Sequence, residues 1–204
     1  MNVIEVERMA RKQIQEERRL QILKALDTCL QEKSFEKTSI KDIARVAGVN
    51  HGVLHYYFSS KEDILLNYID YVIDDYRAQV KEFLSSKDLV RLGKRELIEE
   101  IFGFINDRIT LNKGLSRIFV EIWEIALYHD AVRAKLREAY MRWFDELVAN
   151  LSRHIDDEQF AIHVSIAMVA FWEGMALFST IFEPGALDVK DVLKGFQYRI
   201  LDII

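Results

Sequence analysis

Cysteine and proline are almost absent from this chain of 204 residues. A single cysteine, Cys29, cannot form an internal disulfide, which excludes the small secreted scaffolds that depend on such bonds. The single proline, Pro184, leaves the 183 residues before it free of the residue that interrupts helices most strongly. Glycine is also sparse, with eight residues, and no long stretch alternates apolar and polar residues as a strand does. These absences predict an all-α fold.

Sequence motifs of enzymes and metalloproteins are missing as well. We find no nucleophile elbow, no glycine-rich phosphate loop and no cysteine set with zinc-site spacing. His129 and Asp130 form a lone pair at an expected helix break, where Asp130 more simply caps the following helix. Catalysis needs a constellation of groups, so we predict neither an enzyme nor a metal or cofactor site. The charged N-terminus shows no signal peptide, which makes the cytoplasm the default location.

The composition is that of an ordinary globular protein, with 50% apolar and 30% charged residues. The net charge of −5 is unevenly distributed along the chain. Residues 1–61 carry 11 basic and 8 acidic residues, a net +3, whereas the remainder carries 17 and 25, a net −8. A mildly basic head on an acidic body is typical of a nucleic-acid-binding protein with a separate second task.

Two short helices joined by a tight turn are predicted in the N-terminal third of the chain. Ser39 begins the first helix and has capping-box spacing to Asp42. Gly48 can adopt the left-handed conformation that ends a helix, and Asn50 is a good N-cap for a second helix over residues 51–57. This arrangement predicts a helix-turn-helix, whose second helix enters the major groove of DNA.

The second helix of this motif has an unusual outward face. Leu54 and Phe58 are expected to anchor it on the first helix and on an amphipathic helix over residues 18–33. A plain solvated face would carry lysine and glutamate. The outward positions here are His51, Gly52, Val53, His55, Tyr56 and Tyr57, and the histidines and tyrosines among them carry hydrogen-bond donors and aromatic rings instead. This composition favours contact with DNA over simple solvation.

The rest of the chain predicts a helical body. A long helix begins at Lys61 and ends near Leu84, after which a break is expected at residues 85–88. Pro184 marks a later break. Further helices are expected over residues 94–111, 115–128, 131–154, 158–182 and 188–203. The predicted organisation is a head of residues 1–60 and a body of residues 61–204, with about nine helices in all.

Residues 160–182 are nearly all apolar and long enough to span a membrane. Glu173 and His163 interrupt this run, and a carboxylate in the middle of a span costs about 2.5–3.5 kcal/mol. We therefore expect no membrane partner, and instead a helix covered on one side by its own subunit and on the other by a second copy of the chain. The residues predicted to face that copy are Ala167, Ala170, Gly174 and Phe178.

Aromatic side chains concentrate in the body, where most are expected to belong to the core. Two acids directly follow tryptophans, at positions 124 and 173, and aromatic walls with a carboxylate suit a ligand with a cationic or polar head. The candidate ligand contacts are Phe104, Phe119, Trp123, Glu124, Trp143, Trp172 and Glu173. The alternative is that the two acids pair with Arg108, Arg117 or Arg142.

The segment from Thr38 to Leu65, TSIKDIARVAGVNHGVLHYYFSSKEDIL, resembles the signature of the TetR family of bacterial transcriptional regulators. It has a Thr/Ser-capped first helix, Ile-Ala, Ala-Gly-Val, a capping residue, a glycine two positions on, a leucine followed by an aromatic and histidine cluster, and Ser-Lys-Glu. The resemblance covers roughly residues 18–65, and the rest of the chain agrees with the family in length and helical layout.

This resemblance implies a homodimer. Each subunit would have a three-helix DNA-binding head, residues 1–60, and a body, residues 61–204, that dimerises and binds a small molecule. Carried over position by position, the family's phosphate and base contacts fall on Ser39, Lys41, Arg45, Asn50, His51, Gly52, Val53, His55, Tyr56, Tyr57 and Lys61. His51 replaces a frequent lysine and His55 a frequent tyrosine, so the base preference cannot be copied from relatives.

We therefore expect a sequence-specific DNA-binding transcriptional regulator, and in particular a repressor that an unknown small-molecule effector releases from double-stranded operator DNA. The effector would tilt the long helix that begins at Lys61 and so change the spacing of the two heads in the dimer. The alternative is a helical ligand-binding or adaptor protein without specific DNA binding.

Overall fold

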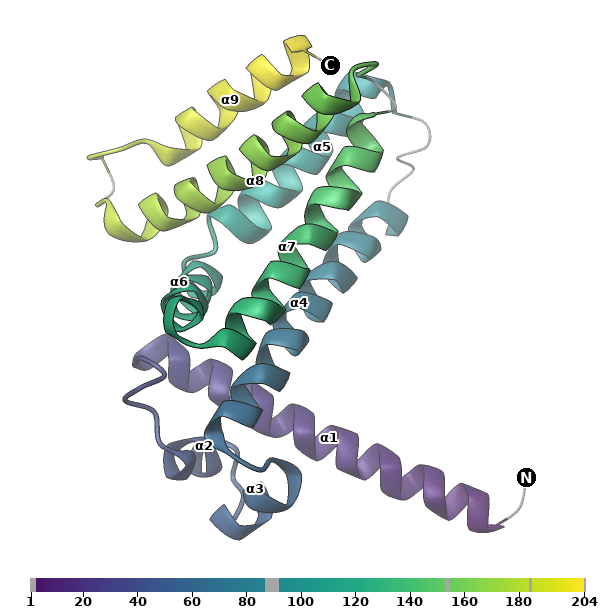
Figure 1. Cartoon of the computed structure of the whole chain (residues 1–204), viewed down its shortest axis with the longest axis vertical. Helices are drawn as coiled ribbons and strands as arrows, with labels where there is room; N and C mark the ends of the chain where they lie inside the picture. Colours follow the sequence, from purple (N-terminus) through teal and green to yellow (C-terminus); the bar gives the residue numbers. More distant parts are fainter. Residues whose placement is uncertain (1–2, 87–91, 153–154, 184, 204) are drawn as a thin grey trace. The chain divides into compact units, whose positions relative to one another are not determined.

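The computed structural model describes residues 3–86, 92–152, 155–183 and 185–203. Within these ranges the chain forms nine α-helices and one π-helical turn, and no strand (Figure 1). The predicted all-α fold with about nine helices is confirmed. The predicted break at residues 85–88 falls partly, and the break at Pro184 wholly, outside the described residues.

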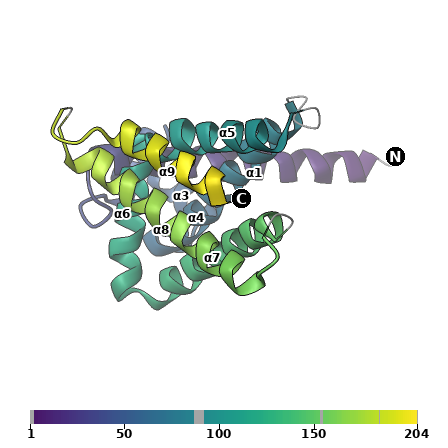
Figure 2. The same cartoon turned by 90° about the horizontal axis from the view of Figure 1, so that it is seen from above.

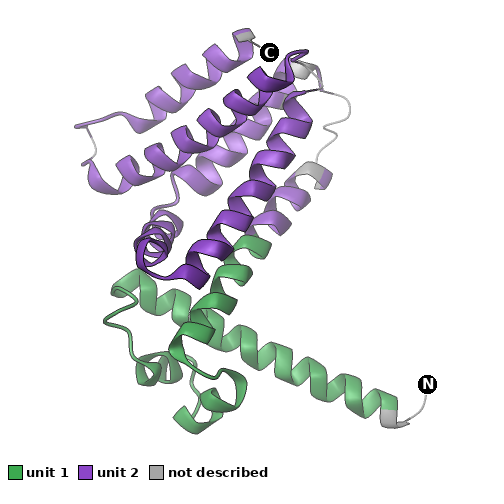
Figure 3. Ribbon diagram, viewed as in Figure 1, with its two compact units in different colours: residues 1–75 green, residues 76–204 purple. Residues whose placement is uncertain are grey.

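The chain divides into two compact units, residues 1–75 and residues 76–204 (Figure 3). The boundary lies inside helix α4 (Lys61–Ser86), later than the predicted boundary at residue 60. The reason is that the first half of α4 packs into unit 1, where Ile64 and Tyr68 are both 0% exposed. The head therefore includes the beginning of a helix that the sequence assigns wholly to the body.

Unit 1 contains three helices besides the beginning of α4: α1 (Val3–Glu32), α2 (Ile40–Val46) and α3 (His51–Tyr57). α2 and α3 contact each other, and both contact α1. Ile22 and Leu26 of α1 are 0% exposed, as are Ile43 of α2 and Leu54 of α3. The apolar stripe predicted for residues 18–33 is thus the base on which the two short helices pack.

Helix α1 is longer than the helix predicted over residues 18–33 and begins at Val3. No proline or glycine lies between Val3 and Glu32, so nothing interrupts the helix toward the N-terminus. Residues 5–18 are exposed, including the apolar Met9 at 60%. Only the second half of α1 contributes to the core of unit 1, which is the half that the apolar pattern identifies.

Unit 2 contains the end of α4, five further α-helices and the π-helical turn η2: α5 (Lys94–Ile105), η2 (Asn106–Thr110), α6 (Lys113–Tyr128), α7 (Asp130–Leu151), α8 (Glu158–Ile181) and α9 (Val189–Ile203). α6, α7 and α8 pack against one another, while α9 lies against both α5 and α8 (Figure 2). The helix predicted over residues 94–111 is α-helical only as far as Ile105, and the chain then continues without a break as the π-helical turn η2. Short π-helical segments are frequent at functional sites.

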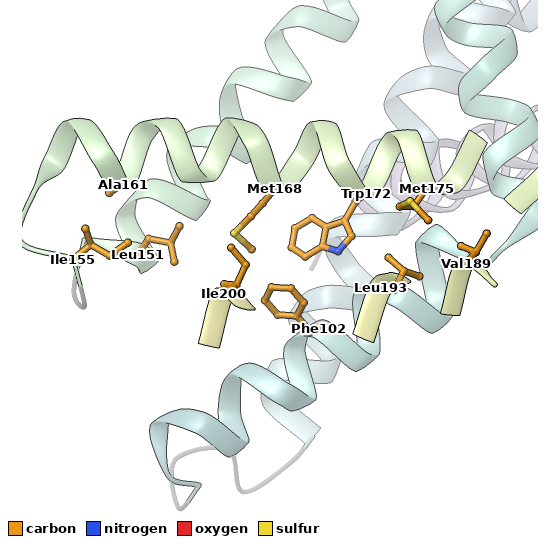
Figure 4. Packing of buried hydrophobic residues seen from close by; sticks show 10 residues of the cluster. All are labelled: Phe102, Leu151, Ile155, Ala161, Met168, Trp172, Met175, Val189, Leu193 and Ile200. Atoms are coloured by element: carbon orange, nitrogen blue, oxygen red, sulfur yellow. The ribbon is translucent and has the colours of Figure 1, made fainter. Parts of the chain in front are cut away.

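The core of unit 2 lies along one side of α8 (Figure 4). The Trp172 ring packs edge to face against Phe102 of α5, with ring centres 5.2 Å apart. Met168, one turn earlier on α8, and Leu193 of α9 belong to the same buried cluster. α8 is therefore the element that joins α5, α7 and α9 into one body.

Helix α8 is also the one helix in the described ranges that is long and apolar enough to cross a membrane, by length and composition only. The core helix of a globular protein passes the same test. Of its apolar window 33% is buried within the chain, and Ile166 and Phe178 remain 44% and 41% exposed. One side of α8 is therefore buried in the core of unit 2, whereas the other side is an apolar surface that the described residues of the chain leave exposed.

Candidate functional site

Ser39 begins α2 with the predicted capping box. Its hydroxyl accepts a 3.1 Å hydrogen bond from the backbone N–H of Asp42, whose carboxylate accepts a 3.0 Å bond from the backbone N–H of Ser39. The ammonium of Lys33 lies 2.8 Å from the same carboxylate. Lys33, together with the Ser39 hydrogen bonds, holds the pKa of Asp42 well below its usual range. The first turn of α2 is therefore fastened to the residue that follows α1.

The turn between α2 and α3 depends on Gly48. Its φ angle is +64°, in the left-handed region that glycine adopts without strain. Asn50 then caps α3, because its side-chain oxygen accepts a 3.0 Å hydrogen bond from the backbone N–H of Gly52. These two residues fix the direction in which α3 leaves α2.

Helix α3 turns one face inward and presents the other to solvent. The two expected anchors are buried, with Leu54 at 0% and Phe58 at 1% exposure. Tyr57 is half-buried. The other residues predicted to face outward are exposed: His51, Gly52, Val53, His55 and Tyr56. The solvent face of α3 is therefore lined by two imidazoles and a phenol.

The aromatic side chains of α3 are arranged in pairs. The rings of His51 and His55 meet edge to face with centres 4.7 Å apart, and those of Tyr56 and Tyr57 do so at 5.0 Å. The Tyr56 hydroxyl also accepts a 3.1 Å hydrogen bond from the side-chain amide of Gln15 in α1. The histidines are one turn apart, a spacing that metal-binding pairs use, but no group of three or more possible metal ligands exists among the described residues.

The remaining predicted DNA contacts lie on α2 and at the ends of the turn. Ser39, Lys41, Arg45 and Asn50 are all exposed. Lys41 and Arg45 are one helical turn apart, so both cations project from the same face of α2. Arg45 is 3.8 Å from Asp42 but keeps 70% of its side chain in solvent. Both cations are available to a phosphate backbone.

Lys61 is placed differently from the phosphate contact that the family resemblance implies. Its ammonium donates hydrogen bonds to the backbone oxygens of Phe35 at 2.8 Å and Thr38 at 3.0 Å. The same ammonium lies 4.2 Å from the centre of the Phe35 ring. Lys61 therefore holds the loop between α1 and α2 in place, and its ammonium N–H groups point toward backbone oxygens of unit 1.

Arg19 of α1 is a residue of this site that the sequence analysis did not single out. Its guanidinium donates hydrogen bonds to the backbone oxygen of Tyr57 at 2.6 Å and to the side chain of Asn67 at 2.7 Å. It also lies 4.3 Å from the centre of the Phe58 ring. Arg19 thereby holds the end of α3 against α1 and the beginning of α4. Its place three residues before Ile22, at the edge of the apolar stripe, is the available signal.

A second site is a cavity of about 260 Å³ inside unit 2. Six of the seven predicted ligand contacts line it: Phe104, Phe119, Trp123, Trp143, Trp172 and Glu173. Glu124, the seventh, is exposed on α6 and does not line the cavity. The physical reason is that neighbouring residues of a helix point about 100° apart, so Glu124 turns to solvent when Trp123 faces inward.

Part of the cavity wall was not predicted. Tyr76, Val80 and Phe83 of α4 line it, as does Thr110 of η2. The three α4 residues follow the i, i+4, i+7 spacing of an inward helix face, but the pattern does not distinguish a cavity wall from a filled core. The cavity is thus bounded in part by the helix that also begins in unit 1.

Glu173 is the last acceptor of a hydrogen-bond chain across three helices. Trp123 of α6 donates a 2.8 Å bond from its indole N–H to the Tyr140 hydroxyl, and Tyr140 of α7 donates a 2.8 Å bond to the Glu173 carboxylate of α8. Burial raises the pKa of Glu173 to about 7, although the Tyr140 hydrogen bond acts in the opposite direction. Burial, and then the charge of Glu173, raise the pKa of Tyr140 as well.

The alternative that Glu173 pairs with an arginine is not what the structure has. Arg142 pairs with Glu138 at 3.0 Å. Within the described part of the chain, Tyr140 is the one hydrogen-bond partner of Glu173, and no lysine or arginine lies within ion-pair distance of its carboxylate. The other carboxylate of the cavity wall, Glu146, does have a cation, because Arg77 lies 3.0 Å from it.

Comparison with known proteins finds similar chains for the head alone and for nearly the whole sequence. Residues 22–68 match the family described as bacterial regulatory proteins, tetR family. Over 198 residues the chain is 33% identical to the uncharacterized HTH-type transcriptional regulator YfiR of Bacillus subtilis (strain 168), and the alignment covers 95% of each chain. The similarity to YfiR therefore extends through both units.

Two further matches differ in reach. Over 65 residues the chain is 38% identical to the HTH-type transcriptional regulator HbdR of Aromatoleum sp. (strain CIB), which covers 32% of this chain and only 28% of HbdR. A transcriptional regulator from Saccharomonospora viridis, solved in complex with choline, has a TM-score of 0.72 at 19% identity, covering 92% of this chain and 96% of that one. The aligned segment of the first match is about as long as the head, and the second match shows a similar fold.

Proposed function

The chain belongs to the TetR family of bacterial regulatory proteins and is a DNA-binding transcriptional regulator, and on this premise we propose that it is a homodimeric repressor that a small molecule releases from its operator. Its relatives are transcriptional regulators, which confirms the prediction that the chain is not an enzyme. A cytoplasmic location, where the operator is found, is part of the proposal.

The observation that carries the DNA-binding part is the exposed face of α3. The buried side chains of Leu54 and Phe58 anchor the inner face of that helix, and the Gly48 turn sets its direction. The outer face is therefore preorganised in the protein without DNA. In this proposal His51, Val53, His55 and Tyr56 read base edges in the major groove, and Gly52, which has no side chain, lets the backbone of α3 approach the DNA closely. Ser39, Lys41, Arg45, Asn50 and Tyr57 bind phosphates, which fix the register without reading sequence.

The exposed side of α8 supports a dimer. Ala167 and Ala170 are exposed, Gly174 is half-buried, and Phe178 is 41% exposed in the single chain. These residues share one helix face, and the small side chains of Ala167, Ala170 and Gly174 permit close approach of a second α8. Ile166 adds further apolar surface, at 44% exposure. A two-fold dimer through this face presents two α3 helices to operator half-sites one or more DNA turns apart, about 34–36 Å each.

The cavity supports the release mechanism. α4 carries Lys61 at one end, in unit 1, and Tyr76, Val80 and Phe83 of the cavity wall at the other. A ligand that binds better to one direction of α4 shifts the population of the dimer toward one spacing of its heads. The Saccharomonospora viridis regulator of the same fold was solved with choline, which supports a small-molecule ligand for a chain of this kind.

Selection of bound DNA from a random pool, with the full-length protein, tests DNA recognition. The expected product is a two-fold symmetric sequence. His51→Ala then changes the selected bases, whereas Tyr57→Phe weakens binding to every sequence by a similar factor, because phosphate contacts carry no sequence information. Weak binding without any selected sequence would contradict the proposal and favour the alternative, a helical ligand-binding or adaptor protein.

Release is tested on the selected operator. Fluorescence anisotropy of labelled operator, bound by wild-type protein, is followed while small molecules are added at fixed salt. The expected result is that a molecule which binds unit 2 lowers operator affinity. A ligand that saturates the cavity and leaves operator affinity unchanged would contradict the release mechanism, and a ligand that raises the affinity would make the protein a co-repressed regulator.

A further inference from the structure

We propose that the ligand of the unit 2 cavity is a small organic cation with an apolar body, and that the Glu173 carboxylate is its counter-charge. This inference rests on the proposed function only for the existence of a ligand. It names the chemical class from the groups that the cavity presents.

The first argument is the electrostatic state of the cavity wall. A carboxylate in an apolar cavity is stable only when it is paired, protonated or supplied with several hydrogen bonds. Glu173 receives one hydrogen bond, from Tyr140, and no cation of the described chain pairs with it. The Glu146 carboxylate in the same wall has Arg77 at 3.0 Å. The cavity therefore presents one negative group that lacks a positive partner.

The second argument is the aromatic surface beside that carboxylate. The Trp143 ring has three aromatic neighbours, with ring centres 5.1 Å away for Tyr140, 5.5 Å for Tyr76 and 6.1 Å for Phe119. Tyr140 belongs to this cluster and also donates its hydroxyl to Glu173, and the other three rings line the same cavity as that carboxylate. Faces of indole and phenol rings attract weakly hydrated organic cations, and a carboxylate adds the full opposite charge.

The third argument is size and remaining polarity. A cavity of about 260 Å³ lies just below the usual range of small-molecule sites, roughly 300–1,000 Å³, and suits a compact molecule. Most of its lining side chains are aliphatic or aromatic. The Thr110 hydroxyl and the indole N–H groups of Trp143 and Trp172 are buried without a hydrogen-bond partner, although all three residues line the cavity. These three groups are hydrogen-bond donors for one or two polar atoms that the ligand carries besides its charged group.

The protonation of Glu173 gives a second readout. Its pKa of about 7 means that part of the protein carries a neutral Glu173 near neutral pH, and a bound cation must displace that proton. The other titratable groups at the cavity are Tyr140, Tyr76 and Glu146 with its partner Arg77. Burial raises the pKa of both tyrosines above their usual range, so they stay neutral throughout. Cation binding therefore releases protons below about pH 7 and weakens as the pH falls.

The experiment compares two molecules of the same shape and different charge. Benzyltrimethylammonium and its neutral carbon isostere, (2,2-dimethylpropyl)benzene, are titrated into the full-length protein without DNA by calorimetry in two buffers of different ionisation enthalpy. Wild type is compared with Glu173→Gln, which keeps an oxygen for the Tyr140 hydrogen bond. The matched control is Glu124→Gln, since Glu124 also follows a tryptophan but lies outside the cavity.

We expect Glu173→Gln to weaken cation binding at least tenfold, to leave binding of the isostere within threefold and to abolish proton release, while Glu124→Gln changes none of these. Equal loss for both molecules, no loss for the cation, or no cation binding to wild type would overturn the inference. A separate outcome concerns the proposed function. If the cation binds through Glu173 and does not release operator DNA, the inference stands and the release mechanism fails; if an uncharged compound releases the operator and cations do not bind, the reverse holds.

Discussion

The ammonium of Lys61 lies 4.2 Å from the centre of the Phe35 ring and donates a 2.8 Å hydrogen bond to the backbone oxygen of that residue. It donates a second bond to Thr38, immediately before the cap of α2. A lysine at the start of the long helix thus holds the loop that positions the helix-turn-helix. The family resemblance places a phosphate contact at the same residue, and the two roles have different experimental signatures.

Lys61→Met separates these roles. The variant keeps the apolar stem and removes the hydrogen bonds to the loop, so unit 1 should lose about 1–3 kcal/mol of stability. Hydrogen exchange of the α2 and α3 amides should quicken accordingly. The salt dependence of operator binding should keep its slope, whereas Lys41→Met, which removes an exposed cation, should lower the slope by about one. An equal change of slope in both variants would restore the phosphate role of Lys61.

Gly48 is the one residue of the α2–α3 turn whose backbone requires glycine. Its φ of +64° should make Gly48→Ala cost about 1–2 kcal/mol, and Gly48→Val more, because a branched side chain resists that conformation. A Cβ at this position would meet no atom within 4 Å, so strain in the backbone and not a collision causes the loss. Operator binding and hydrogen exchange of α3 measure it. If the Gly48→Val protein behaved like wild type, the turn would have to adopt another conformation.

The sequence identified the short-range interactions of the head better than its long-range ones. Ser39, Gly48 and Asn50 act on neighbours within three residues, so their roles can be read from spacing alone. Arg19 and Lys61 act over 38 and 26 residues, through hydrogen bonds that no local pattern encodes.

The cavity shows the same limit. Aromatic content predicted five of its lining residues, but the sequence treats Glu124 and Glu173 alike, since each follows a tryptophan. Only the rotation of α6 and α8 within unit 2 separates them, turning Glu124 to solvent and Glu173 to the cavity. The position of Tyr140 opposite Glu173 depends on how α7 packs against α8, which a single sequence does not specify.

Ala170→Glu tests the dimer face. Ala170 is exposed in the single chain, so the variant should fold, but a dimer through α8 would bury two carboxylates without partners. We expect a monomer by sedimentation or light scattering and a loss of operator affinity of at least a hundredfold, because a single head binds one half-site. Ala131→Glu, at an exposed position of α7, is the matched control and should remain dimeric. A dimeric Ala170→Glu would place the interface elsewhere.

The ionisation of Glu173 should make the stability of unit 2 depend on pH in a defined direction. The pKa of this carboxyl is about 7 in the folded chain, against 4.5 as its ordinary value, so between these pH values the folded state holds a proton that the unfolded state has lost. Stability contributed by the neutral carboxyl is therefore complete below about pH 4.5, declines as the pH rises and is lost above about pH 7.

Glu173→Gln stays neutral at every pH, so its stability relative to wild type should increase by about 2–3 kcal/mol between pH 5 and pH 8. All three tryptophans belong to unit 2, so urea unfolding followed by tryptophan fluorescence, at one protein concentration, reports on that unit alone. Glu124→Gln controls for the loss of one negative charge. A difference between Glu173→Gln and wild type that is the same at both pH values would mean that Glu173 is already charged in the folded protein at pH 5, and that its cavity is more polar than the structure indicates.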